Sequence, residues 1–151
     1  MKKEISYKEK KHVLTATDSE MIWFGDFEIK GNVVNIEVFS DKSESIWDDF
    51  VDFLNYLEDG QMLNELILKK APSLLNSLAI CFWDIKNECI LFKFSGINFY
   101  GVGTSLSNSA FNYELVFELN DANGDGIDDS YANWLVTMSN NHITGIRREQ
   151  I

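Results

Sequence analysis

Residues 111–119 read Phe111-Asn-Tyr-Glu-Leu-Val-Phe-Glu-Leu119, and this stretch decides the fold of the C-terminal part of the chain. Its aromatic and aliphatic residues are mostly spaced two apart, at Phe111, Tyr113, Leu115, Phe117 and Leu119. A period of two predicts a strand with one buried face. The same alternation returns at Trp134, Val136 and Met138, beyond an acidic loop. We therefore predict an antiparallel meander of strands 111–119, 131–139 and 142–148, with a turn at Asn140-Asn141.

The first half of the chain predicts one further hairpin and a helical centre. Residues 21–29 and 33–39 alternate on either side of Lys30-Gly31-Asn32, which indicates a β-hairpin. Helical spacing follows over 43–59, where Ile46, Phe50, Leu54 and Leu57 form an apolar stripe. It resumes over 61–71 and again after Pro72. The expected fold class is α+β: an N-terminal β-hairpin, two or three central helices and a C-terminal antiparallel meander, with the helices packed on one face of the sheet.

Length and composition predict one domain. A chain of 151 residues, 45% of them hydrophobic, is long enough to bury a core. Residues 1–11 hold five lysines and two glutamates, and we expect a lysine-rich tail or an edge segment there, with residues 12–151 forming the single α+β domain. The segment 96–110 is rich in Gly, Ser and Asn and is expected to be a loop, with an edge strand at 97–102 as the alternative.

The sequence predicts a cytoplasmic protein. It contains no apolar run of about 18 residues, the length that a transmembrane helix needs. The Met-Lys-Lys start is not followed by the apolar region of a signal peptide. Cys81 and Cys89 lie among apolar neighbours and are interpreted as reduced thiols. Together with His12 and His142 they do not have the spacing of a zinc site.

The net charge of −11 bears on the choice of partner. Nucleic acid is disfavoured, because two polyanions repel each other. A basic protein partner is favoured, since opposite potentials steer association. Segment 41–59 holds seven acids against one lysine, and Asp48, Asp49 and Asp52 on its helix are the candidate partner-binding residues. The alternatives are that these acids form a solvated helix face and that the overall acidity serves solubility.

The loop Asp121-Ala-Asn-Gly-Asp-Gly-Ile-Asp-Asp129 is a candidate calcium site. Side-chain oxygens of Asp121, Asn123, Asp125 and Asp129 and the carbonyl of Ile127 are spaced as Ca²⁺ ligands around a glycine turn. The flanks argue against an EF-hand, because strand periodicity borders the loop and Ala132 stands where a bidentate Glu is needed. The loop resembles the inter-strand calcium loops of integrin-type propellers, which implies a calcium-stabilised binding module. The alternative is a solvated polar hairpin loop.

The sequence carries no Gly-x-Ser-x-Gly, His-Glu-x-x-His, Cys-x-x-Cys or dinucleotide-binding fingerprint. A non-enzymatic protein is therefore predicted. A carboxylate-based hydrolase is the less favoured alternative, because nothing in the sequence places two carboxylates across a cleft.

The C-terminal third resembles the ending of small bacterial immunity proteins of polymorphic toxin systems. The resemblance rests on Asp129-Ser-Tyr-Ala-Asn-Trp-Leu-Val136 and Gly145-Ile-Arg-Arg-Glu-Gln150. It implies a cytoplasmic bacterial protein that neutralises a cognate toxin by tight binding. For Arg147 and Arg148 we expect ion pairs across the sheet to Glu114 or Glu118.

Overall fold

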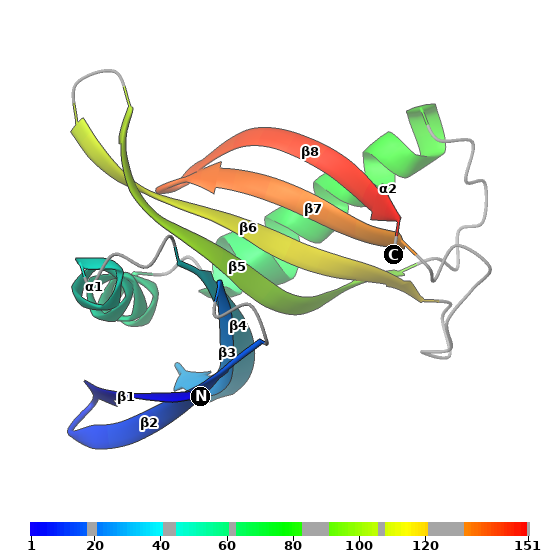
Figure 1. The fold of residues 1–151 in the computed structure, drawn as a ribbon. Coiled ribbons are helices and arrows are strands. Elements are labelled where there is room, and N and C mark those ends of the chain that lie inside the picture. Colours follow the sequence, from blue (N-terminus) through cyan, green and yellow to red (C-terminus); the bar gives the residue numbers. More distant parts are fainter. Residues whose placement is uncertain are drawn as a thin grey trace.

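The computed structural model describes residues 1–17, 21–40, 45–60, 63–82, 91–105, 108–120 and 132–150. Within these ranges the chain forms an eight-stranded sheet whose strands lie in sequence order, from β1 at one edge to β8 at the other (Figure 1). The strands are β1 (Lys2–Tyr7), β2 (Lys10–Ala16), β3 (Ile22–Ile29), β4 (Asn32–Phe39), β5 (Leu91–Ser105), β6 (Asn108–Asn120), β7 (Ala132–Ser139) and β8 (His142–Gln150). The helical segments are α1 (Ser45–Asp59), the π-helix η1 (Leu63–Lys70) and α2 (Ala71–Phe82), which follows η1 directly.

The fold class predicted from the sequence is wrong. The sheet dominates the described chain, and two short α-helices accompany it, so the fold is sheet-dominated and not one of two or three central helices packed on a sheet. Part of the difference lies at the N-terminus. Residues 1–11, for which a tail and an edge segment were both open, belong to the sheet as β1 and the start of β2. Lys8 and Glu9 adopt positive φ angles of 52° and 60° and form the tight turn that joins β1 to β2 in a hairpin.

The rest of the difference lies in β5, which occupies much of the segment predicted to be a loop. β5 is 15 residues long and pairs with both β4 and β6, so it is a central strand and not an edge strand. Its pairing with β6 has irregularities before Gly96 and before Gly101. Such bulges insert an extra residue and bend a strand. The glycines that indicated a loop therefore mark the bends of a long strand.

Other elements are confirmed. The predicted hairpin over 21–39 is β3–β4, the predicted helix is α1, and the C-terminal meander is β6–β7–β8. The stripe expected along α1 is buried, and it packs on the aromatic residues of the sheet: the Phe53 ring stacks on Phe99 at 4.6 Å, and the Phe50 ring meets Phe27 edge-on at 5.3 Å. In Figure 1, α2 lies behind β5–β8, and its Leu75 and Ala79 belong to the same core. The described helices therefore leave the opposite face of the sheet open.

The joint between β4 and β5 shapes this open face. It is the one parallel pairing among the described strands and spans three residue pairs, from Ile36–Ile97 to Val38–Phe99. The two backbones approach closely beside it, because a Cβ atom placed on Gly96 would lie 2.8 Å from the carbonyl oxygen of Asn35. In Figure 1, β3 and β4 run across the direction of β5–β8. The sheet is therefore hollowed where its two halves meet.

Candidate functional site

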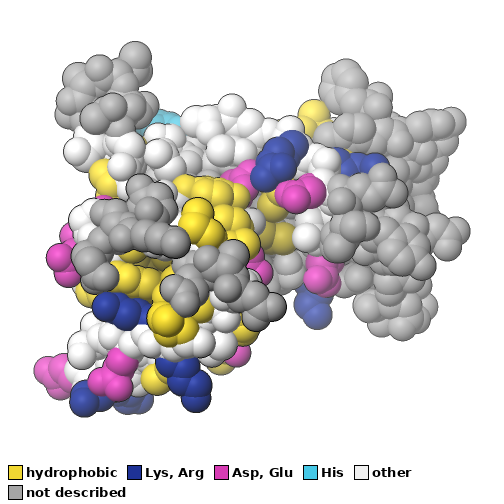
Figure 2. All heavy atoms as spheres, in the orientation of Figure 1, with side chains coloured by type: hydrophobic (Ala, Val, Ile, Leu, Met, Phe, Trp, Pro, Cys, Tyr) yellow, Lys and Arg dark blue, Asp and Glu magenta, His cyan; other side chains and the backbone are white. Residues whose placement is uncertain are grey.

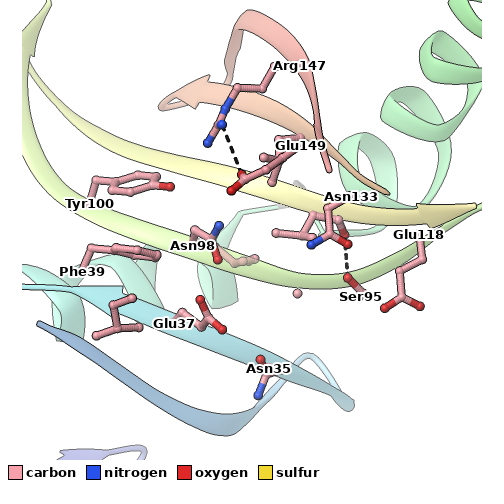
Figure 3. A pocket seen from close by; sticks show the side chains of 15 residues that line it. Asn35, Glu37, Phe39, Ser95, Asn98, Tyr100, Glu118, Asn133, Arg147 and Glu149 are labelled. Carbon is pink, nitrogen blue, oxygen red and sulfur yellow. Dashed lines mark hydrogen bonds and ion pairs between the residues drawn. The ribbon is translucent and has the colours of Figure 1, made fainter. Parts of the chain in front are cut away.

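The open face of the sheet contains a hollow of about 640 Å³ at this joint. β5 runs along it, β4 lies on one side, and β7 and β8 lie on the other (Figure 3). We call this hollow the open-face site. Its lining residues are Ile22, Asn35, Glu37, Phe39, Ser95, Gly96, Ile97, Asn98, Tyr100, Val116, Glu118, Asn133, Leu135, Arg147 and Glu149.

Carboxylates border the open-face site on several sides. Glu37 stands on β4, Glu118 on β6 and Glu149 on β8, and Figure 3 shows them around the hollow and not in one cluster. Arg147 is the one cation among the described residues that line it. Acidic and basic side chains also border a central group of hydrophobic side chains in the space-filling view (Figure 2). The lining is therefore acidic in sum, since three carboxylates outnumber one guanidinium.

A buried carboxylate underlies the site. The Glu114 side chain is 5% exposed and receives hydrogen bonds of 3.0 Å from both Nε and Nη2 of Arg147. The Tyr100 hydroxyl also donates to Glu114, and the Thr137 hydroxyl donates at 3.3 Å. The ion pair predicted for Arg147 with Glu114 or Glu118 is confirmed, and its acceptor is Glu114. Arg148 faces the other way, with its guanidinium 5.6 Å from the centre of the Trp134 ring.

These contacts shift the titration of the groups involved. Burial alone raises the pKa of the Glu114 carboxyl, but the hydrogen bonds from Arg147, Tyr100 and Thr137 and the charge of Arg147 outweigh it and hold the pKa below its ordinary value. Burial, and then the hydrogen bond and charge of Glu114, raise the pKa of Tyr100 to about 12. Glu114 is therefore a charged anchor for Arg147, and the Nη1 of Arg147 lies 3.2 Å from the carboxylate of Glu149.

An aromatic pair stands at one end of the open-face site. The rings of Phe39 and Tyr100 lie 4.8 Å apart, tilted by 33°, and 41% of Tyr100 is exposed. The same two residues also line a second hollow of about 210 Å³, together with Asp49 of α1 and Val102 of β5. The pair therefore lies between two adjoining hollows and contributes to both.

The structure separates the three aspartates predicted from the sequence as one docking surface. Asp48 and Asp52 are exposed and line a hollow of about 540 Å³ between α1 and β1, where Lys3 Nζ lies 5.4 Å from the Trp47 ring centre. Asp49 instead lines the small hollow beside Tyr100. These residues therefore belong to two surfaces, and one of the three adjoins the open-face site.

The candidate calcium loop, with Asp121, Asn123, Asp125, Ile127 and Asp129, lies outside the described residues. It connects β6 to β7, two strands that line the open-face site through Glu118 and Asn133. Among the residues that the structure does describe, no group of three or more His, Cys, Asp or Glu side chains is arranged to hold a metal ion.

Most of the open-face site was missed by sequence reasoning. Glu37 and Glu149 lie far apart in the sequence, and only the folded sheet brings them to the same hollow. One signal was present: Glu114 and Glu118 alternate with the apolar face of the strand over 111–119, so both belong on its opposite face. Comparison with protein-family models, with curated proteins and with solved structures finds no match for this chain. In the described part of the chain, none of the helices has the length and apolar character that crossing a membrane requires.

Proposed function

We propose that this chain is a non-enzymatic bacterial interaction protein that binds a basic protein partner through the open-face site. The observation that carries the proposal is the hollow itself, which combines three rim carboxylates with exposed aromatic surface on rigid strands. Exposed aromatic rings are typical of recognition surfaces. Opposite charge on the partner would speed association and fix its orientation.

The lining residues favour binding over catalysis. No His or Cys is among the described residues that line the hollow, and the Ser95 hydroxyl donates to the Val116 carbonyl at 3.3 Å. A nucleophile needs an adjacent base, and Glu114, the most buried carboxylate nearby, is engaged by Arg147. The ring of His12 packs near Tyr7 and Phe27, at 5.8 and 5.3 Å, on the core side. We therefore assign the site to recognition.

The biological role proposed here is that of an immunity protein which neutralises a basic toxin. Support comes from the net charge of −11, from the resemblance of the C-terminal third and from the acidic hollow. The cytoplasm is the proposed compartment, since Cys81 and Cys89 are best interpreted as reduced thiols. Loop 121–129 is retained as a calcium-binding element of the same protein, adjoining the strands of the site.

Affinity capture with matched variants tests this function. The site variant is E37Q/E118Q/E149Q, and the control variant is E9Q/D59N/E65Q, which removes the same charge from exposed positions outside the hollow. Each is immobilised with the wild type, and proteins retained from a bacterial extract are eluted with salt, identified and purified. Calorimetry with the purified partner should give nanomolar affinity for the wild type and the control, and a loss of about tenfold or more for the site variant.

Two results would contradict the proposal. Equal affinity of the site variant and the control variant would show that the open-face carboxylates do not contribute. A loss confined to D48N/D52N would instead place the partner on the surface between α1 and β1.

A further inference from the structure

The two hollows beside the aromatic pair adjoin each other. Phe39 and Tyr100 line both of them, so the hollow at Asp49 adjoins the open-face site at this pair. We call the combined surface the β5 trough, because β5 contributes to it from Ser95 to Val102. Seven residue steps of a strand cover roughly 23 Å, somewhat less where bulges bend it. A segment of about seven residues in extended form has the same length.

The carboxylates of the trough favour a bound cation at the Phe39–Tyr100 pair. Glu37 stands two residues before Phe39 on β4, and alternate residues of a strand share a face. Asp49 lines the trough on the other side of the pair. A cation over the exposed part of Tyr100 therefore has a carboxylate on either side. Arg147 does not fill this position, because Glu114 holds its Nε and Nη2, and its Nη1 lies 3.2 Å from Glu149.

Arginine fits this position better than lysine. A guanidinium is planar, stacks on aromatic rings and offers donors on two edges, whereas an ammonium is a compact and strongly hydrated charge. Carboxylates accept the guanidinium through paired hydrogen bonds.

We propose that the partner binds through an extended, arginine-bearing segment that lies along the β5 trough and seats a guanidinium on the Phe39–Tyr100 pair between Glu37 and Asp49. This inference rests on the proposed function and specifies the form of its partner. It requires no folded surface of the partner for recognition. Alternate arginines of an extended segment would face the trough, so a second one would reach the carboxylates of Glu118 and Glu149.

Short peptides test the inference directly. The probe is acetyl-Ser-Arg-Ser-Arg-Ser-Arg-Ser-amide, and its counterparts carry lysine or neutral citrulline in place of arginine. Binding is followed by amide chemical shifts of the ¹⁵N-labelled full chain at low salt. We expect shifts along β4, β5 and β8, a dissociation constant about fivefold weaker for the lysine peptide, and no binding of the citrulline peptide.

Matched substitutions locate the guanidinium. F39L removes one ring and D49N one carboxylate of the trough, and each should weaken the arginine peptide by about fivefold. F24L makes the same change at a ring that is 42% exposed outside both hollows, and D59N does so at an exposed acid of the same helix, so both should stay within about twofold of the wild type.

Three results would overturn the inference. They are equal affinity for the arginine and lysine peptides, equal affinity of F39L and F24L, and no peptide binding by a wild type that captures its partner through the open-face carboxylates. The last result would leave the proposed function standing and require a folded epitope. Failure of the proposed function is distinct, since it appears as capture that E37Q/E118Q/E149Q does not impair.

Discussion

Arg147 and Glu114 lie on β8 and β6, two strands separated by β7, and are joined by two hydrogen bonds of 3.0 Å. The guanidinium is half exposed, while the carboxylate is buried, so the pair reaches from the floor of the open-face site to its surface. A buried carboxylate without its partner is costly, because the interior cannot replace the hydration that it lost. This pair is therefore expected to govern the stability of the C-terminal meander.

Substitution of Arg147 should reveal that dependence. R147M keeps an apolar stem and removes the guanidinium, and we expect the free energy of unfolding to fall by about 2–3 kcal/mol. E114Q/R147M should recover part of this loss, because no uncompensated carboxylate stays buried. Urea unfolding of the wild type, both single variants and the double variant measures the coupling.

The matched control is R148M, whose guanidinium lies over Trp134 on the other face of the sheet. It should cost about 1 kcal/mol or less. Losses of equal size at the two arginines would remove the special role of the Arg147–Glu114 pair.

The same pair predicts how stability depends on pH. The pKa of Glu114 is lower in the folded protein than its ordinary value of 4.5, so the carboxylate contributes stability that is fully present above about pH 4.5 and is lost as the pH falls through the folded pKa. The wild type should therefore lose its advantage over E114Q on acidification from pH 6 towards pH 3. The pKa of Glu58 is lowered as well, but Glu58 titrates in both proteins and cancels in the difference.

Unfolding by urea at several pH values from 3 to 7 measures the difference between wild type and E114Q. A difference that does not change over this range would show that Glu114 does not titrate as the structure implies.

Close packing of β4 on β5 gives a third prediction. Gly96→Ala places a Cβ atom 2.8 Å from the carbonyl oxygen of Asn35, which backbone movement alone can relieve. We expect a loss of about 1–3 kcal/mol in unfolding free energy and disturbed amide shifts along both strands. Gly145→Ala is the control, since its nearest neighbour is the Thr137 hydroxyl at 3.8 Å. Comparable effects at the two glycines would contradict a tight β4–β5 joint.

The strands and the helix that were predicted correctly have regularly spaced apolar residues. Every odd-numbered residue from 111 to 119 is apolar, and the stripe of α1 keeps helical spacing, so each pattern can be recognised from a short stretch of sequence. In β5 the positions that face the core change partway along the strand. Phe92 and Phe94 face the core at even positions, but Ile97 and Phe99 do so at odd positions, because a bulge precedes Gly96. A strand that changes parity in this way resembles a polar loop when it is rich in glycine and asparagine.

The open-face site could not be predicted from the sequence for a different reason. Its rim residues Glu37, Glu118 and Glu149 come from three strands, and only the parallel joint of β4 with β5 brings the two halves of the sheet together. Parallel pairing follows a long crossover and leaves no short-range signal in the sequence. The Arg147–Glu114 pair was predictable because both residues lie in the meander, where strand order and facing follow from alternation.

A thermal test addresses the loop Asp121–Asp129. If Asp121, Asn123, Asp125, Ile127 and Asp129 coordinate Ca²⁺, metal-stripped protein should melt several degrees higher in 1 mM Ca²⁺ than in EDTA, since ligand at about 100 times its dissociation constant adds roughly 2.7 kcal/mol. Mg²⁺ should raise the melting temperature less, because it prefers a stricter octahedron and keeps its waters.

Asp125→Ala should abolish the calcium-dependent rise, whereas Asp59→Ala, at an exposed acid of α1, should retain it. A rise that survives Asp125→Ala would move the calcium elsewhere, and no rise in the wild type would make the loop an ordinary solvated turn.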